Sequence, residues 1–165
     1  MICIQPRKIA ALSLAKRLAE ELGVTLGEEV GYDFKSDKKI SQNTKLTFMT
    51  ERIFLDKLIK ENQNADPNRS YFKKVKSILL DEVHERNMTI DLIMGLLLQI
   101  VKRFPHLKVI ICSATVNEDL FKRYFDPCNV LHIMGRTHPV DVIYKPIGDN
   151  EEFIQGANKL IKQIC

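Results

Sequence analysis

The sequence predicts an α/β fold with a mostly parallel β-sheet, and two observations lead to this class. Short apolar runs rich in branched residues alternate with longer amphipathic stretches, as in repeated strand and helix units. The chain has 165 residues, 45% of them hydrophobic and 28% charged, which is enough to bury one sizeable core. One main domain is therefore expected.

Six apolar runs are predicted to form the strands of this sheet. They cover residues 2–4, 46–49, 77–80, 109–112, 130–134 and 140–144. Two polar, turn-prone segments, residues 33–44 and 62–70, are predicted to be surface loops.

Amphipathic stretches between these runs predict the helices. Residues 6–22 carry an apolar stripe that ends before Gly23, a natural C-terminal stop; the stripe consists of Ala11, Leu14, Ala15, Leu18 and Leu22. Residues 89–103 carry a second stripe with three- and four-residue spacing, made of Ile90, Ile93, Met94, Leu97, Leu98 and Val101. Shorter helices are predicted at residues 50–60 and 117–125.

The segment after residue 145 is predicted to be separate from the main domain. It begins like a linker and continues into an amphipathic helix, residues 151–164, with few further residues to pack against. This helix packs on the domain's own surface or is the first helix of another domain. The chain is therefore divided into residues 1–145 and 146–165.

The composition indicates a reduced intracellular protein. A formal net charge of +4 is compatible with nucleic-acid binding but does not establish it. The four cysteines show no CxxC spacing, and neither a signal peptide nor a run of membrane-helix length is present. We expect no membrane partner, and both nucleus and cytoplasm stay open.

The stretch Asp-Glu-Val-His-Glu-Arg, residues 81–86, places titratable groups directly after a predicted strand. The carboxyl ends of parallel strands form the edge where open α/β sheets bind ligands. At this edge Asp81 can hold a Mg²⁺ that nucleotide phosphates carry, while Glu82 can orient an attacking water. In the alternative interpretation, both acids only cap the next helix and pair with Arg86. A zinc protease is excluded, because residue 88 is Met where an HExxH pattern requires its second His.

Three other strand ends place polar groups at the same predicted edge. Ser113 and Thr115 follow the fourth strand and can bond the carboxylate or imidazole of the acidic stretch. Arg7 and Lys8 follow the first strand at a helix start, where phosphates bind well. Thr50 offers a hydroxyl at another helix start. Each residue alone is more often an ordinary surface residue, but together they predict an edge that binds phosphate and metal.

The order of these segments resembles the first RecA-like domain of the DEAH-box helicases of superfamily two, over nearly the whole chain. The matching segments are Gln5-Pro6-Arg7-Lys8-Ile9-Ala10-Ala11 (motif Ia), Val30-Gly31-Tyr32 (a connecting strand), Phe48-Met49-Thr50-Glu51 (motif Ib), Asp81-Glu82-Val83-His84-Glu85-Arg86 (motif II), Ser113-Ala114-Thr115 (motif III) and Gly135-Arg136-Thr137-His138-Pro139-Val140 (the closing segment). The resemblance implies a RecA-like three-layer sandwich, with residues 146–165 as a linker and the first helix of a second such domain.

The resemblance also implies a catalytic group and a coupling group. Asp81 would hold Mg²⁺ through water, and Glu82 would polarise the water that attacks the γ-phosphate of ATP, with His84 as the third catalytic residue. His84, Ser113 and Thr115 would couple the nucleotide state to the nucleic acid.

A nucleic-acid group is implied in the same way. Arg7, Lys8 and Thr50 would contact the phosphate backbone of single-stranded RNA without reading its bases. ATP hydrolysis that opens and closes two RecA-like domains over the RNA would then move their contacts along the RNA strand.

Two departures from the family pattern stand out. Val83 replaces the alanine of the family name, a small apolar change that we expect to be tolerated. No glycine-rich loop ending in Gly-Lys-Ser/Thr precedes motif Ia, so the sandwich is expected to be truncated at its N-terminal strand, with a gap or an exposed edge in the sheet. Dimerisation or lower stability would follow.

The sequence thus leads to part of the motor of an ATP-dependent RNA helicase, with this chain alone inactive. The alternative is a non-enzymatic, helicase-like module that binds RNA or a protein partner. A protein activator is a further candidate partner, and the oligomeric state is left open.

Overall fold

The computed structural model describes residues 1–64, 66, 69–115, 118–135, 138–142, 144 and 153–164, with the backbone alone at 118, 120 and 164. The chain divides into two compact units, Met1–Val130 and Leu131–Cys165, which are described separately. The predicted boundary after residue 145 lies outside the described residues. None of the described helices is long and apolar enough to cross a membrane.

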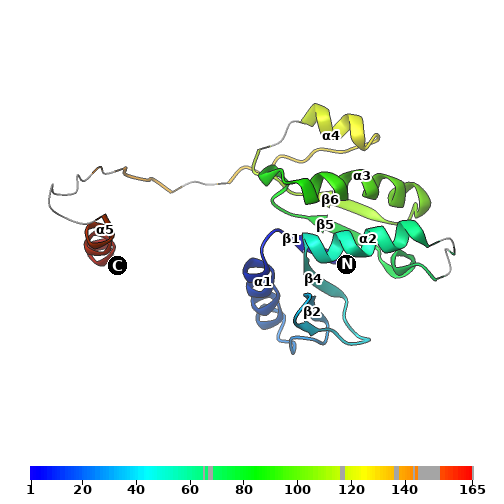
Figure 1. The fold of residues 1–165 in the computed structure, drawn as a ribbon, viewed down its shortest axis with the longest axis horizontal. Helices are drawn as coiled ribbons and strands as arrows, with labels where there is room; N and C mark the ends of the chain where they lie inside the picture. The colour runs from blue at the N-terminus through cyan, green and yellow to red at the C-terminus, as the bar shows by residue number, and fades with distance from the viewer. Residues whose placement is uncertain are drawn as a thin grey trace. The chain divides into compact units, whose positions relative to one another are not determined.

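The first unit is built on a six-stranded sheet with the order β3-β2-β4-β1-β5-β6 (Figure 1). All neighbouring strands are parallel except the β2–β3 pair. The strands are β1 (Ile2–Gln5), β2 (Val30–Asp33), β3 (Lys38–Lys39), β4 (Leu46–Thr50), β5 (Ser77–Leu80) and β6 (Lys108–Ile111). This arrangement confirms the predicted α/β class and is consistent with a RecA-like fold.

Helices cover both faces of this sheet, which gives three layers. The helices are α1 (Lys8–Glu21), α2 (Glu51–Gln63), α3 (Met88–Arg103) and α4 (Glu118–Tyr124), with 3-10 turns η2 (Tyr71–Lys74) and η3 (Val83–Glu85). Side chains of β1, β4 and β5 alternate between the two cores, as the strand period requires. Ile4 and Leu80 face the core beneath α2 and α3, whereas Cys3 faces the smaller core beneath α1.

Helix α1 begins at Lys8, two residues later than predicted, because Arg7 is still extended (φ −119°, ψ 133°). The predicted stripe is also partly wrong. Ala11, Ala15 and Ala19 are buried, whereas Leu14 is exposed. A face of small alanine side chains lets the helix approach the sheet closely, so the larger leucines lie toward its margin.

Three further predictions need correction. The predicted loop 33–44 contains β3, which pairs antiparallel with β2. Residues 130–134 form no strand; Leu131, Ile133 and Met134 are exposed. The described residues within 140–144 are also not in a strand. Apolar character alone does not form a strand, because the backbone also needs a hydrogen-bonded neighbour.

In the second unit, the described part of the predicted helix 151–164 is α5 (Phe153–Ile164). Phe153, Ile154 and Ile161 on its apolar face are exposed. In the first unit, Cys3, Cys112 and Cys128 are free thiols.

Candidate active site at the carboxyl edge of the sheet

The carboxyl ends of the parallel strands share one edge of the sheet, and the predicted site residues follow them. Gln5 ends β1, Thr50 ends β4, and Asp81 follows β5 directly. The fold thus brings three distant parts of the sequence to one edge. This is the edge where open α/β sheets bind ligands.

The acidic stretch forms a tight turn with unusual backbone geometry. Glu82 (φ 55°) and Arg86 (φ 40°) both lie in the left-handed region and flank the turn η3. Non-glycine residues adopt this region at a cost and often do so at functional sites. The turn is anchored by Val83, which is 1% exposed and donates its backbone N–H to the Cys112 carbonyl at 3.2 Å.

The Asp81 carboxylate is oriented by two neutral donors. The Gln5 side-chain Nε2 donates to Oδ2 at 2.7 Å, and the Glu82 backbone N–H donates to Oδ1 at 3.0 Å. In the part of the chain that the structure describes, Asp81 forms no ion pair. The two hydrogen bonds therefore hold the carboxylate group in one orientation, and no positively charged side chain among the described residues neutralises it.

His84 connects the acidic stretch to the loop after β6. The Ala114 backbone N–H donates to Nδ1 at 3.2 Å, and Nε2 lies 3.4 Å from Glu82 Oε2. Because Nδ1 accepts a hydrogen bond, the proton is on Nε2, facing the glutamate. The imidazole thus bridges Glu82 and residue 114.

Ser113 and Thr115 lie in this loop but do not make the contact expected of their hydroxyls. The Ser113 hydroxyl donates to the Thr115 carbonyl at 2.6 Å. No hydrogen bond joins either hydroxyl to the acidic stretch among the described residues. The contact with His84 comes from the backbone between them, which a side-chain pattern could not reveal.

The alternative interpretation, in which the two acids cap a helix and pair with Arg86, is not what the structure contains. Arg86 instead forms a double hydrogen bond with Asp91, with Nε–Oδ1 at 3.1 Å and Nη2–Oδ2 at 3.3 Å. The N-cap of α3 is Asn87, whose Oδ1 accepts the Ile90 backbone N–H at 2.9 Å. Glu82 occupies the N-cap position of η3, but its side chain makes no capping hydrogen bond there.

The three predicted nucleic-acid residues, Arg7, Lys8 and Thr50, end or follow strands at this edge of the sheet. The side chains of Arg7 and Lys8 interact with neighbouring side chains. Arg7 Nη2 lies 3.4 Å from Glu85 Oε1, in an exposed pair. Lys8 Nζ donates to the Ser36 hydroxyl at 3.1 Å and lies 5.5 Å from the Phe34 ring centroid. Thr50 is the N-cap residue of α2, but its side chain makes no capping hydrogen bond.

Three residues of this edge had no role in the sequence analysis: Gln5, Glu51 and Asn87. Glu51 is 6% exposed, and its Oε2 accepts a hydrogen bond from Asn87 Nδ2 at 2.9 Å. Burial raises the pKa of the Glu51 carboxyl. Gln5 and Glu51 stand in the segments that resemble motifs Ia and Ib, whereas the signal for Asn87 was its position directly after the acidic stretch.

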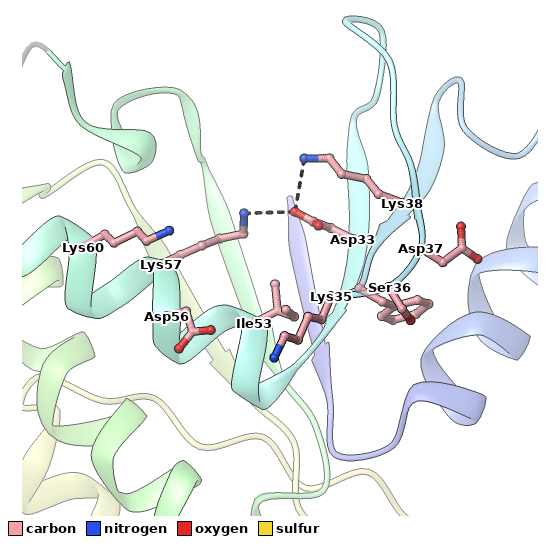
Figure 2. Close-up of a pocket in the computed structure, with 10 residues that line it drawn as sticks. Asp33, Lys35, Ser36, Asp37, Lys38, Ile53, Asp56, Lys57 and Lys60 are labelled. Atoms are coloured by element: carbon pink, nitrogen blue, oxygen red, sulfur yellow. Dashed lines mark ion pairs between the residues drawn. The ribbon is translucent and has the colours of Figure 1, made fainter.

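A cavity of about 510 Å³ lies at the same edge, next to β2 (Figure 2). Lysines from the loop after β2, from β3 and from α2 line it, namely Lys35, Lys38, Lys57 and Lys60. Figure 2 shows Lys38 and Lys57 pointing at Asp33, with Nζ–Oδ2 distances of 3.6 and 3.0 Å. Lys35 and Lys60 have no ion pair in the described part of the chain, but Asp37 and Asp56 also line the cavity, so its lining carries charges of both signs.

Comparison with known proteins finds relatives of this chain. No protein-family model matches the chain. Over 144 residues, 87% of its length, the chain is 41% identical to a Schizosaccharomyces pombe protein named "Putative ATP-dependent RNA helicase ucp12". The chain spans 10% of the length of that protein. It is therefore related in sequence, over most of its length, to one segment of a protein named as an RNA helicase.

Proposed function

We propose that this chain is part of the first RecA-like domain of a DEAH-box RNA helicase, where it helps to couple ATP hydrolysis to movement on single-stranded RNA. The observation that carries the proposal is the Asp81 carboxylate, oriented by neutral donors next to Glu82 at the carboxyl edge. The similarity to a segment of a protein named as an ATP-dependent RNA helicase supports the same assignment.

The residues at this edge fit a Mg²⁺ that arrives with nucleotide phosphates. Such an ion needs only one or two protein carboxylates, because phosphates and waters complete its octahedron. Asp81 supplies an oriented, uncompensated carboxylate for it. Among the described residues no group of three His, Cys, Asp or Glu side chains is placed to hold a metal ion. When bound, Mg²⁺ would offset the charge that develops on the phosphates.

Glu82 would orient the attacking water and accept its proton. Its side chain is about half exposed, so water reaches it. The Nε2–H of His84 faces Oε2 and leaves the other carboxylate oxygen to accept from water. Since His84 also accepts from the Ala114 N–H, a shift of the loop after β6 would move the imidazole and, with it, Glu82.

On the RNA side, Arg7 and Thr50 would contact backbone phosphates without reading bases. Lys8 would join them once it releases Ser36. The lysine-lined cavity beside β2 would extend this cationic surface along the same edge. Binding through such contacts should weaken steeply as salt rises.

The first test is calorimetric titration of this chain with Mg²⁺ and a non-hydrolysable ATP analogue. The chain contains no Gly-Lys-Ser/Thr phosphate loop, so we expect weak binding and negligible hydrolysis. Any binding should be lost in Asp81→Ala, since this change removes the metal-directed carboxylate. Binding that is unchanged in this variant would exclude Asp81 as the metal ligand.

The second test applies to any longer protein that contains this chain and hydrolyses ATP. Glu82→Gln should lower kcat by roughly 100-fold or more while nucleotide affinity stays largely unchanged, because the amide cannot accept the proton of the water. The control is Glu20→Gln on the exposed side of α1, which should change neither quantity. Normal turnover in Glu82→Gln would end the catalytic assignment.

A non-enzymatic module that binds RNA or a protein partner is the second candidate. It predicts salt-sensitive RNA binding that neither Mg²⁺-nucleotide nor Glu82→Gln affects.

A further inference from the structure

Among the described residues, Gln5 is the one buried polar side chain that donates a hydrogen bond to the acidic stretch. It ends β1, is 3% exposed, and its Nε2 lies 2.7 Å from Asp81 Oδ2. The same nitrogen has one other contact, a long one of 3.8 Å to Cys3 Sγ. An amide buried this deeply is normally hydrogen-bonded, and here its short hydrogen bond is made to the proposed metal ligand.

The chemical type of this donor matters as much as its position. A lysine or arginine at position 5 would also hold the carboxylate, but it would cancel the charge that attracts a cation. A glutamine amide fixes the carboxylate without neutralising it, and it leaves each oxygen with a further lone pair. The Glu82 backbone N–H does the same at the other oxygen.

Gln5 also belongs to the segment that carries Arg7. Arg7 pairs with Glu85, so residues 5 and 7 contact the acidic stretch at both its ends. A displacement of this segment by a nucleic-acid backbone held at Arg7 would therefore move the donor that orients Asp81.

We infer that Gln5 is a positioning residue, which holds the Asp81 carboxylate in the direction required by a divalent cation and transmits movements of the Arg7 segment to it. This inference rests on the proposed function, because it takes Asp81 to be the metal ligand. A residue that only filled space in the sheet would affect stability and leave cation binding unchanged.

The experiment follows the NMR signals of this chain during titration with MnCl₂ alone, since the paramagnetic ion broadens nearby resonances. In the wild type, the amide signals of Asp81 and Glu82 should broaden first. Gln5→Met keeps the side-chain length but cannot donate, and it should raise the half-broadening concentration by roughly tenfold, the lower end of what loss of a ligand-orienting partner costs. Ile2→Val, a small buried change on the same strand, is the stability control and should leave that concentration unchanged.

A measurement on the wild type alone protects the test against a variant that fails to fold. The side-chain amide signals of Gln5 should broaden at a lower Mn²⁺ concentration than those of Gln99, which is exposed on α3. Equal behaviour of the two glutamines would overturn the inference.

The outcomes separate the two proposals. If the wild type binds Mn²⁺ at Asp81 and Gln5→Met binds it equally well, the inference about Gln5 fails and the proposed function stands. If the wild type shows no broadening at residues 81 and 82, the metal assignment of Asp81 fails, and the inference fails with it.

Discussion

Two buried glutamates on α2 illustrate how the surroundings of a single residue decide its chemistry. Glu61 is 3% exposed and has a cationic neighbour, with Arg103 Nη1 at 3.5 Å from Oε1, and its Oε2 accepts the Tyr71 backbone N–H. Glu51 is also buried, but its one hydrogen-bond partner is the neutral amide of Asn87, and its Oε1 has none. Burial therefore raises the pKa of Glu51, with a smaller contribution from the charge of Glu85.

Glu51→Gln should make the stability of the protein less dependent on pH. Because the pKa of Glu51 is higher in the folded than in the unfolded state, the folded state binds more protons between those two values. The free energy of unfolding of the wild type therefore falls as pH rises from about the ordinary glutamate value to the raised one, and levels off above it. The glutamine variant lacks this loss, so its free energy of unfolding relative to that of the wild type should be higher at pH 8 than at pH 4.

Urea denaturation between pH 4 and pH 8 measures this difference. Glu61→Gln is the matched control; it should instead lower the free energy of unfolding, by about 1–3 kcal/mol, because Arg103 loses its carboxylate partner and keeps the neutral carbonyls of residues 61 and 64. A constant difference between Glu51→Gln and the wild type across the pH range would contradict the prediction.

At the scale of elements, close backbone approach decides details that hydrophobic patterns miss. The predicted α1 stripe combined Ala11 and Ala15 with leucines, but only the alanine face, completed by Ala19, is buried against the sheet. The short strand β3 lies in a segment predicted as a loop, and β2 accommodates it at Gly31. A Cβ atom at Gly31 would lie 2.3 Å from the Lys39 carbonyl oxygen. Only a residue without a side chain allows this pairing.

Gly31→Ala should separate β3 from β2 and lower the free energy of unfolding by about 1–3 kcal/mol, as overpacking does. Gly95→Ala on α3 is the matched control, because nothing lies within 4 Å of its added Cβ. That change should stabilise the protein by up to about 1 kcal/mol through helix propensity. Urea denaturation gives both values, and faster amide hydrogen exchange at Tyr32 and Lys39 in Gly31→Ala would locate the damage. Equal free energies of unfolding for the two variants would show that β3 can move away from residue 31 without loss of stability.

Ala15→Leu tests the alanine face of α1. Ala15 is fully buried, so the larger side chain should push the helix from the sheet and cost about 1–3 kcal/mol. Lys16→Leu, the next residue on the exposed side, should change stability by less than about 0.5 kcal/mol. Thermal unfolding compares the two variants. If Ala15→Leu lowers stability by less than Lys16→Leu does, the space between α1 and the sheet can accommodate a larger side chain.

At the scale of the whole molecule, the sheet has one continuous set of strands and an open margin. The sequence analysis expected a gap or an exposed edge, and the described strands show no gap. Strand β6 ends the order, and in the described part of the chain no strand pairs with its outer side. Its Ile110 is 44% exposed. An apolar, unpaired edge strand favours association between chains.

Ile110→Lys should therefore reduce self-association of this chain, because a charged side chain on an edge strand opposes pairing with another edge. Sedimentation velocity over a range of protein concentrations measures the effect. Ile9→Lys removes a more exposed isoleucine, 84% exposed on α1, and should leave association at the wild-type level. Loss of association in both variants, or in neither, would exclude β6 as its cause.

The sequence by itself determined the α/β class, four of the strands and the extents of α2, α3 and α4 to within a few residues, because apolar runs and helical periodicity are local properties. It also identified Asp81 and Glu82 as residues at a strand end. Only the tertiary structure decided which partners they have. Gln5 and Ala114 reach the acidic stretch from β1 and from the loop after β6, and residues 130–134 do not form a strand despite their apolar character. These features depend on which backbones become neighbours, and that is set by packing of the whole sheet rather than by any local pattern.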